Sequence, residues 1–561
     1  MKKAIPVIIA IVLIILIGGA YVGVKFLERY SYSKEYADLN EYYGVNGQAD
    51  TAIILQDEII EEKALLKDGV YYFDFATVRK YFNDRFYEDK TEGLLLYTTP
   101  VDTIRTEIGS STYIKEGSPV ESDYALSFYD GETLYIAAEY LKNYCNFSYS
   151  VFTEPNRMQV YTQWGEETTA QIEKDTAVRY QGGVKSDILK DIKKGDTVTI
   201  LETMETWSKV KTKDSVIGYV ENKRLSEPAV AEQIPVTDYV EPEFTCLTRD
   251  YKINLAWHQV WNADANSTLA SMLAPTKGVN VISPTWFSLS DNEGGFTSIA
   301  SGSYVQQAHD MGLEVWALID NFSTEISTKT ILSSTTTRTR LIDNLVQTVK
   351  DYSIDGINID FEQVSADAGD DYIQFIRELS VACRREGIVL SVDNYVPTGY
   401  TDHYNREEQG LFADYVIVMG YDEHYSGSEA GPVASTKYVT EGIENTIAVV
   451  PENKVINAVP FYTRIWKTEG DVVSCDSVSM DAAAQFVANN GIETYWNGET
   501  GHNYGEIQTG EAFYQVWLED IQALEQKLGI MGNYNLGGIA GWKLGLENAA
   551  AWDLIENYMN Q

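Results

Sequence analysis

The stretch Asp355-Gly356-Ile357-Asn358-Ile359-Asp360-Phe361-Glu362 decides how the C-terminal half of this chain is interpreted. Apolar and polar residues alternate along it, and a period of two predicts a β-strand with two different faces. The apolar side chains then face one side, while Asn358, Asp360 and Glu362 face the other. Burying polar groups without partners costs roughly 1–3 kcal/mol each, so three in a row indicate a functional site. The alternative is a buried ion pair with a purely structural role.

Short apolar runs of this kind recur along residues 250–561, separated by segments with helical periodicity. Eight such runs joined by helices predict an α/β fold, a (β/α)8 TIM barrel, in which the chemistry lies at the C-terminal ends of the strands. The quoted stretch is then the fourth strand, and its polar row points into the barrel and toward its mouth. The eight predicted strands are 253–257, 279–285, 314–319, 356–361, 389–393, 415–419, 454–460 and 538–542.

Several motifs in this region resemble glycoside hydrolase family 18, the chitinases and their relatives. Residues 355–362 resemble the family signature DxxDxDxE, and Met419-Gly420-Tyr421-Asp422 resembles its M-x-Y-D motif. The predicted seventh strand, 458–466, is similar to that of the family, and Trp542 ends the eighth strand, where the family places an aromatic floor. Residues 282–287 look closest to the spore-cortex-lytic branch, whose members cleave peptidoglycan. The resemblance covers residues 250–561.

The resemblance implies a retaining reaction in which the N-acetyl group of the substrate, rather than an enzyme side chain, attacks the anomeric carbon. Glu362 would protonate the glycosidic oxygen and later activate water. Asp360 would accept the acetamide N–H, and Tyr421 would donate to the acetamide carbonyl. Trp542 would stack beneath the sugar ring, and Asp422 would bind sugar hydroxyls.

One position departs from the family pattern. Asn358 stands where the family's second aspartate is expected, and it is placed among the catalytic groups. Without that second charge, Asp360 is expected to ionise more readily at neutral pH, and Asn358→Asp is expected to shift the acidic limb of the pH–rate profile. An argument based on a proton shared between the two aspartates does not carry over. Trp257 and Trp286 are expected to line the sugar-binding groove, with packing at the barrel rim as the alternative.

The N-terminus indicates export. Lys2 and Lys3 precede an uncharged apolar stretch, residues 4–24. Such a stretch is long enough to span a bilayer as a helix, and the lysines favour a cytoplasmic N-terminus. We expect residues 1–27 to be a single-pass membrane anchor with the bulk of the chain outside the cell. The alternative is a cleaved signal peptide, with Gly18-Gly19-Ala20 before the cut, that releases the protein to the cell wall.

Residues 28–50 are polar and tyrosine-rich, and we interpret them as a juxtamembrane stalk. Residues 51–165 contain an internal repeat, because 70–73 and 133–136 each follow an Asp-Gly turn and precede a helical pattern. Each copy ends in a strand with Tyr-Thr. The repeat resembles the small α/β domain named for the N-terminal region of copper amine oxidases, although no His cluster that could hold copper accompanies it.

Residues 170–226 contain short β-rich runs separated by turn residues, which predicts a small all-β barrel. The segment resembles the bacterial SH3-like domain, and this resemblance implies binding of wall peptides; a spacer is the alternative. Residues 227–249 carry several prolines among acidic residues and are interpreted as a linker. The barrel, residues 250–561, is expected to cleave soluble oligosaccharides without the modules that precede it.

Composition excludes several classes of function. Lys and Arg number 43 and Asp and Glu 83, a formal net charge of −40. Such a chain lacks the basic face that nucleic-acid binding requires. Four cysteines without CxxC spacing argue against a disulfide scaffold and against structural zinc. We see no P-loop and no Ser-His-Asp pattern, so the expected reaction uses no metal and no cofactor.

The sequence therefore predicts an exported glycosidase that hydrolyses β-1,4 bonds in a wall polymer containing N-acetylglucosamine. The membrane tether and the SH3-like module favour peptidoglycan over chitin as the partner. A chitinase and a non-catalytic lectin stay open as alternatives, although the presence of Glu362 argues against a lectin. Endo or exo cleavage, and a vegetative or spore role, are not readable from the sequence.

Overall fold

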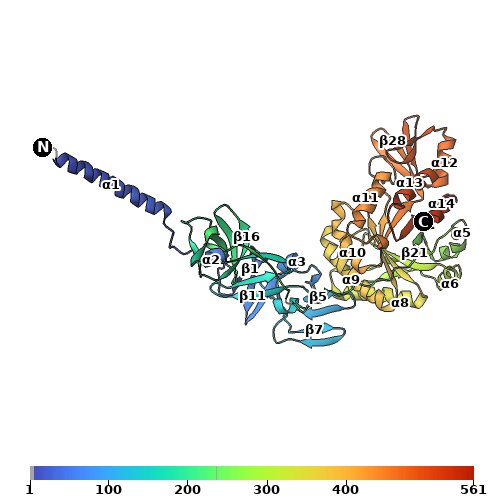
Figure 1. Ribbon diagram of the computed structural model, residues 1–561. Helices are drawn as coiled ribbons and strands as arrows, with labels where there is room; N and C mark the ends of the chain where they lie inside the picture. The colour runs from blue at the N-terminus through green and yellow to red at the C-terminus, as the bar shows by residue number, and fades with distance from the viewer. Residues whose placement is uncertain (1–4, 236, 561) are drawn as a thin grey trace. The chain divides into compact units, whose positions relative to one another are not determined.

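The computed structural model describes residues 5–235 and 237–560, which form two compact units (Figure 1). One unit contains the described residues up to Phe86, together with Ile108–Thr112 and Glu121–Glu241. The other contains Tyr87–Glu107, Tyr113–Val120 and the described residues from Pro242 onward. Each unit is described by itself below.

The second unit is built on a closed barrel of eight parallel strands, which confirms the predicted fold. The strand order is β20-β33-β27-β26-β25-β24-β23-β21, and β20 also pairs with β21, so the ring is complete. The strands are β20 (Ile253–His258), β21 (Val281–Leu289), β23 (Glu314–Asp320), β24 (Gly356–Asp360), β25 (Val389–Tyr395), β26 (Tyr415–Met419), β27 (Val455–Pro460) and β33 (Gly538–Trp542). A short strand, β22 (Phe296–Ser298), runs antiparallel to β21.

Helices cover the outside of this barrel (Figure 1). They are α5 (Leu269–Leu273), α6 (Gly302–Asp310), α7 (Thr328–Leu332), α8 (Thr335–Tyr352), α9 (Gly369–Glu386), α10 (Arg406–Phe412), α11 (Thr436–Ile447), α13 (Ile521–Met531) and α14 (Ala551–Met559). The long helix α9 ends because Gly387 adopts φ 72°, where its N–H closes on the carbonyls of Cys383 and Arg384. A residue without Cβ takes that left-handed conformation at the lowest cost.

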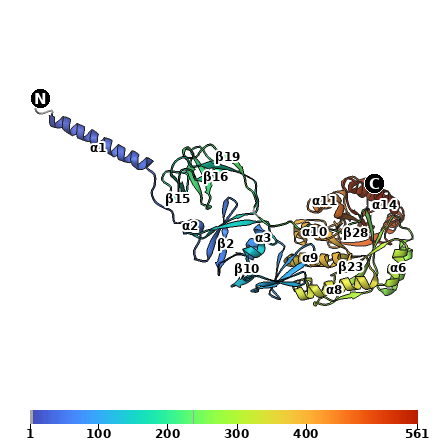
Figure 2. The ribbon, with the colours of Figure 1, turned by 60° about the horizontal axis from the view of Figure 1, so that its bottom comes forward.

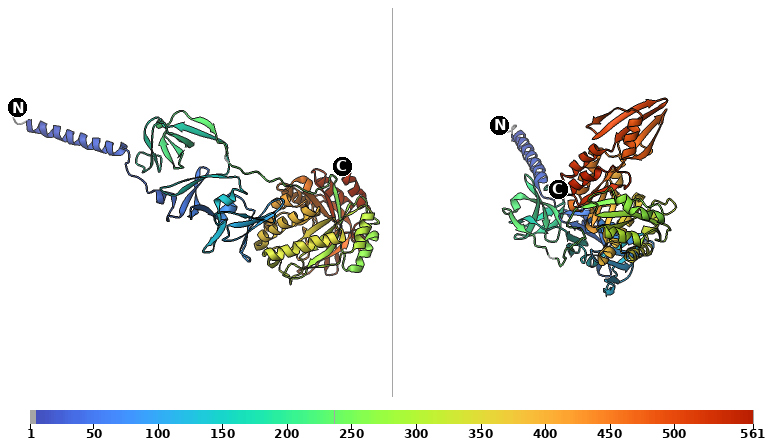
Figure 3. Two further views of the ribbon diagram at one scale, coloured as in Figure 1. Left: turned by 90° about the horizontal axis from the view of Figure 1, so that it is seen from below. Right: turned by 90° about the vertical axis from the view of Figure 1, so that its right-hand side faces the viewer.

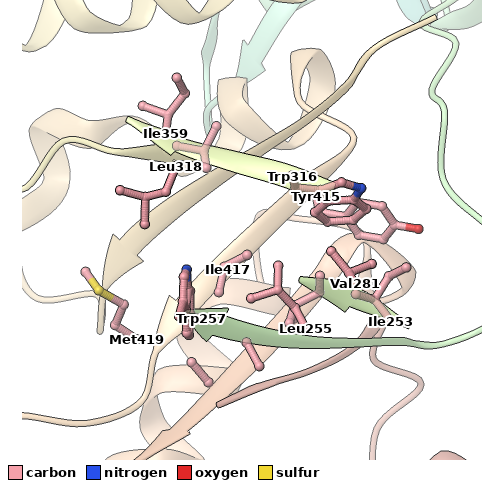
Figure 4. Close-up of a cluster of buried hydrophobic side chains, with 14 of the residues drawn as sticks. Ile253, Leu255, Trp257, Val281, Trp316, Leu318, Ile359, Tyr415, Ile417 and Met419 are labelled. Carbon is pink, nitrogen blue, oxygen red and sulfur yellow. The ribbon is translucent and has the colours of Figure 1, made fainter. Parts of the chain in front are cut away.

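The barrel interior changes from apolar to polar along the strands. Near the strand starts, Trp316 and Tyr415 stack with ring centroids 5.3 Å apart (Figure 4). Leu255 and Ile417 continue this fully buried filling. Toward the C-terminal ends the inward positions become polar, so the packed lower part supports a site above it, as expected for this fold.

An insertion between β27 and β33 forms its own five-stranded antiparallel sheet, visible beside the barrel in the right-hand view of Figure 3. Its strands are β28 (Tyr462–Glu469), β29 (Val472–Ser479), β30 (Thr494–Asn497), β31 (His502–Thr509) and β32 (Ala512–Leu518). Helix α12 (Met480–Asn489) packs Ala483 against Val516 and Leu518 of this sheet. The predicted seventh barrel strand, 454–460, corresponds to β27, which ends at Pro460. The family-like stretch 458–466 runs past that end, because the chain enters the insertion sheet at Tyr462.

A second sheet, in the order β4-β5-β6-β7-β8, belongs largely to the barrel unit. Its strands are β4 (Phe86–Asp89), β5 (Leu94–Thr98), β6 (Thr103–Glu107), β7 (Thr112–Lys115) and β8 (Ser118–Glu121). The Tyr87 hydroxyl donates to Asp371 of α9 at 2.6 Å, and the Gln374 amide of α9 donates to Thr98 at 3.0 Å. Part of the stretch predicted as one α/β domain thus packs on the barrel helices, and a barrel starting at residue 250 would lack it.

In the first unit a seven-stranded sheet carries the two copies of the repeat (Figure 2). Its order is β11-β12-β1-β2-β3-β10-β9, and β3 and β10, the equivalent strands of the two copies, lie side by side. The copies diverge at their last strand, because β12 stays in this sheet while β5 joins the other one. The elements are α2 (Leu39–Tyr43), β1 (Asp50–Leu55), β2 (Glu58–Lys67), β3 (Val70–Asp74), α3 (Phe75–Tyr81), β9 (Ser127–Asp130), β10 (Thr133–Ala137), α4 (Ala138–Leu141), β11 (Ser148–Phe152) and β12 (Arg157–Tyr161).

The same unit contains an all-β module, as predicted, with the strand order β15-β14-β18-β17-β16-β13-β19. Its core includes Val178, Leu189, Val210 and Val220. The strands are β13 (Glu166–Gln171), β14 (Thr176–Arg179), β15 (Ile188–Ile192), β16 (Thr197–Thr203), β17 (Trp207–Thr212), β18 (Ile217–Glu221) and β19 (Ala229–Glu232). A continuous helix, α1 (Ile5–Tyr30), precedes both modules (Figure 2). Within it, Val7–Tyr30 is long and apolar enough to cross a membrane, a property that signal sequences share.

Candidate active site

A cavity of about 510 Å³ opens at the C-terminal ends of the barrel strands. It lies where the fold places chemistry. Its lining combines acidic and aromatic side chains from six of the barrel strands and from loops after the strands, including the loop after β26. The acidic residues are Asp320, Asp360, Glu362, Asp393 and Asp422, and the aromatic residues are Trp257, Trp261, Trp286, Phe322, Tyr395, Tyr421 and Trp542.

Asn358 lies inside the barrel, as the alternation predicts, and is completely buried. Its Oδ1 accepts from the Trp257 indole N–H at 2.9 Å and from the Ser283 hydroxyl at 3.1 Å. Its Nδ2 donates to Ser391 Oγ at 3.1 Å and to Asp393 Oδ1 at 2.8 Å. Both lone pairs and both amide hydrogens are therefore occupied, and the amide donates to Asp393 rather than to Asp360.

Asp360 is 5% exposed, and its Oδ1 has no hydrogen-bond partner. Burial, reinforced by the carboxyls of Asp393, Glu362 and Asp320, raises the pKa of Asp360 well above its usual value. This raised pKa opposes ionisation of Asp360 near neutral pH. The expectation that Asp360 ionises more readily with Asn358 than with an aspartate at that position stays a prediction. Asn358 does remove one charge from the fourth strand, but Asp393 supplies another from the fifth.

Glu362 follows the end of β24, and its Oε2 accepts a hydrogen bond from the Tyr395 hydroxyl at 2.6 Å. Burial raises the pKa of Glu362, the hydrogen bond from Tyr395 opposes that rise, and Asp422 and Asp320 add to it. A carboxyl with a raised pKa keeps its proton closer to neutral pH, which is what a general acid needs.

Tyr421 and Asp422 follow β26 and both line the cavity. Tyr421 is buried, and burial raises the pKa of its hydroxyl well above the usual value, so it is present as a neutral donor. Asp422 has φ 60° and accepts hydrogen bonds from Tyr462 and, at 2.6 Å, from Arg464 of the insertion sheet. The insertion thereby fixes one carboxylate of the site.

The three tryptophans chosen from the sequence all line the cavity, but not equally. Trp542 is half-buried at the end of β33 and meets Trp257 edge to face, with centroids 5.8 Å apart. Trp257 and Trp286 are buried, and their indole N–H groups bond Asn358 and Asn266 respectively. These two rings therefore form the wall behind the cavity, while Trp542 presents surface to it.

Sequence reasoning missed three titratable residues of the lining, Asp320, Asp393 and Tyr395. Asp320 and Asp393 stand at the C-terminal ends of the third and fifth strands, which is the signal that could have found them. Asp320 accepts from Ser288 Oγ at 2.7 Å and from the Phe322 N–H at 3.1 Å. Among residues 5–235 and 237–560, no cluster of His, Cys, Asp and Glu has the arrangement of a metal site.

Two family matches cover the barrel and the small all-β module. Residues 274–547 match the glycosyl hydrolases family 18, and residues 174–226 match the bacterial SH3 domain. These two matches do not include residues 51–165, so the resemblance of the repeat domain to the copper amine oxidase module stays a prediction.

Individual proteins similar to this chain also have names that refer to glycosylases or lytic enzymes. A Bacillus subtilis chain described as a sporulation-specific glycosylase, YdhD, is 33% identical over 236 residues, which is 40% of this chain and 55% of the relative. The cortical fragment-lytic enzyme of Bacillus subtilis is 26% identical over 248 residues, 43% of this chain and 57% of the relative. This chain thus spans little more than half the length of these two relatives.

A solved structure shares the fold. The chitinase of Chromobacterium violaceum aligns with a TM-score of 0.50 and 21% identity, covering 55% of this chain and 99% of that one.

Proposed function

We propose that the protein is an exported glycosidase that cuts β-1,4 bonds in peptidoglycan, because residues 274–547 of its barrel unit match the glycosyl hydrolases family 18. The reaction retains configuration and uses the N-acetyl group of the substrate as the nucleophile. The observation that carries this proposal is the buried, unpartnered Oδ1 of Asp360 in a cavity that also contains Glu362, a carboxyl whose pKa is raised by burial.

An acceptor oxygen without a donor in a buried site is energetically unfavourable. An acetamide N–H of a bound sugar supplies that donor, and holding the N–H aims the acetamide carbonyl at the anomeric carbon. Tyr421 donates to the same carbonyl, and Glu362 protonates the departing oxygen. Trp542 offers a flat apolar surface for one face of the ring, and Asp422 accepts from sugar hydroxyls.

Three observations support peptidoglycan as the substrate class. The chain has a bacterial SH3 domain, an N-terminal helix long and apolar enough to cross a membrane, and relatives named as a sporulation-specific glycosylase and a cortical fragment-lytic enzyme. In this proposal the helix tethers the protein with its bulk outside the cell, and the SH3 domain holds wall peptides near the barrel.

The test uses the full-length chain in detergent, incubated with peptidoglycan fragments and with chitin oligomers, and mass spectrometry of the products. Cleavage beside N-acetylglucosamine in peptidoglycan is expected. Preferred cleavage of chitin would assign the chitinase activity instead. Fragments whose acetyl group has been removed should survive, and their cleavage at an equal rate would refute the substrate-assisted reaction.

Glu362→Gln separates an enzyme from a lectin. Turnover should fall at least about 100-fold, while binding of the glycan persists. Glu525→Gln, at an exposed position of α13, is the matched control and should leave both unchanged. If the wild-type chain binds glycan but releases no product, and Glu362→Gln changes nothing, the protein is a lectin.

The tether is tested by fractionation of cells that express the chain. The full-length protein should sediment with membranes, and a variant without residues 1–30 should not. Recovery in the medium of a product that lacks only the N-terminal apolar segment would instead identify a cleaved signal sequence.

A further inference from the structure

Asp393 stands level with Asp360 on the neighbouring strand. The register of β24 and β25 pairs Asn358 with Ser391 and Ile359 with Val392, which brings Asp360 opposite Asp393. In-register neighbours of adjacent strands project to the same face about 5 Å apart. Asp393 is 3% exposed and lines the same cavity. Two buried carboxyls therefore share one level of the barrel interior.

Asn358 distinguishes these two carboxyls. An indole N–H can only donate, so the Trp257 hydrogen bond requires the amide oxygen of Asn358 to face Trp257. The amide nitrogen must then face Asp393, to which it donates at 2.8 Å. The Oδ1 of Asp360 receives no such donor. A donated hydrogen bond favours the charged form of a carboxyl, so negative charge is more favourable on Asp393 than on Asp360.

The groups around Asp360 and Asp393 do not favour ionisation of both carboxyls. The charged groups that act most strongly on Asp360 are themselves carboxyls, and burial opposes ionisation of both members of the pair. Like charges this close in a buried site cannot both be ionised without a large penalty. The titratable groups that face the pair are Asp320, Glu362, Tyr372, Tyr395, Tyr404 and Tyr421.

We propose that Asp393 is the positioning residue that carries the negative charge of this pair in the free protein and takes over the proton of Asp360 when an N-acetyl group binds. The inference rests on the proposed function. In the free site, Asp360 holds the single proton and Asp393 the charge. When an acetamide N–H donates to Asp360, the proton moves to Asp393 and the charge to Asp360, where it faces the positive charge that develops on the substrate.

The pair holds one proton before and after this shift, so none is taken from or released to solvent. The carboxyl that the family signature places at position 358 is, in this chain, supplied from the neighbouring strand. Asn358 fixes it there.

The test removes the carboxyl at position 393 and then restores one at position 358. Asp393→Asn keeps an acceptor for Asn358 but removes the internal site for the proton, so Asp360 must release its proton to solvent. The turnover number should fall roughly tenfold or more with little change in KM, and the acidic limb should move to higher pH. The double variant Asn358→Asp/Asp393→Asn restores one carboxyl and one amide, and both values should return toward wild type.

Asp343→Asn, exposed on α8, is the matched control for loss of a carboxyl, and thermal unfolding verifies that each variant is folded. An unchanged rate and pH profile in Asp393→Asn would overturn the inference. So would a folded double variant that stays as slow as Asp393→Asn, because a merely structural Asp393 gives no reason for rescue from another strand.

An infrared comparison separates this inference from the proposed function. At neutral pH the free wild-type protein should show a carbonyl stretch of a protonated carboxyl that Asp360→Asn removes. That result would hold even if no glycan were cleaved. Persistence of the whole signal in Asp360→Asn would refute the assignment of the proton.

Discussion

The sheet formed by β4 to β8 makes the barrel dependent on residues far from it in sequence, and this can be tested at Asp89. The first three amides of helix α8 are bonded to Asp89, Glu92 and Ser334 in turn. Two of these three acceptors are carboxylates of the β4–β5 turn region, and negative charge at a helix N-terminus is favourable.

Asp89 contributes more than Glu92 because it is completely buried, whereas Glu92 is exposed. Asp89 accepts from the Thr335 N–H at 2.6 Å and the Thr335 hydroxyl at 2.5 Å, and from the N–H groups of Thr91 and Glu92 at 2.9 and 3.0 Å. Asp89→Ala leaves these donors unsatisfied, and loss of a helix cap with buried charged hydrogen bonds is expected to cost about 3 kcal/mol. In a unit of roughly 350 residues, that is a fall of about 4 °C in Tm.

Differential scanning calorimetry of the full-length chain in detergent measures this. The barrel transition should fall by about 4 °C in Asp89→Ala, by less in Glu92→Ala, and not at all in Glu107→Ala, an exposed carboxylate of the same sheet. If Asp89→Ala and Glu107→Ala unfold together at the wild-type temperature, the sheet is not part of the folding unit of the barrel. A barrel cut at residue 250 would then be as stable as the barrel in the whole chain.

Three further predictions concern titration and burial. Tyr395→Phe removes the hydrogen bond that lowers the pKa of Glu362, so the acid keeps its proton to higher pH and the alkaline limb of the rate profile should move upward; a downward shift would contradict this role. Burial lowers the pKa of His258 to about 4. As the pH falls, the unfolded chain therefore binds a proton at His258 before the folded chain does. The free energy of unfolding should fall between about pH 6.5 and 4, by up to roughly 3 kcal/mol. Urea unfolding of His258→Gln should show a flatter profile in that window, and an equally steep one would exclude His258 as the cause. Lys527→Met leaves the buried carboxylate of Glu519 without its ammonium partner at 2.7 Å. The variant should be destabilised by about 3–5 kcal/mol in chemical denaturation. A free energy of unfolding equal to that of the wild type would refute this.

The barrel and the inward row of β24 could be predicted because both follow from local pattern. Alternation within eight residues assigns Asn358 and Asp360 to the interior whatever lies opposite. The spacing of apolar runs assigns the number of strands, and the closed strand order then follows from the fold. A local pattern does not predict which side chains of neighbouring strands lie side by side, because that depends on the register between the strands.

Because register is not local, the sequence could not predict that Asp393 lies beside Asp360, and the charge argument for Asp360 left out this carboxyl. The sequence shows Asn358 in place of an aspartate, which predicts one carboxylate fewer beside Asp360. The structure brings Asp393 to the level of Asp360 from a strand that begins 33 residues later, Gly356 pairing with Val389. The packing of the β4–β8 sheet on the barrel is also not local. Nothing in residues 87–107 indicates contact with a helix near residue 335, so the sequence did not predict it.

The arrangement of charge in the barrel mouth links stability to chemistry. A barrel interior filled by branched apolar residues would be more stable than one that holds three aspartates at one level. The structure confines them to the open end, above the layer of Trp316 and Tyr415. Asp320 has two donors within the protein, Asp393 has the Asn358 amide, and the Oδ1 of Asp360 has none. The Oδ1 of Asp360 is thus the least satisfied of these acceptors, and a ligand that donates an N–H to it gains a hydrogen bond that the folded chain does not supply.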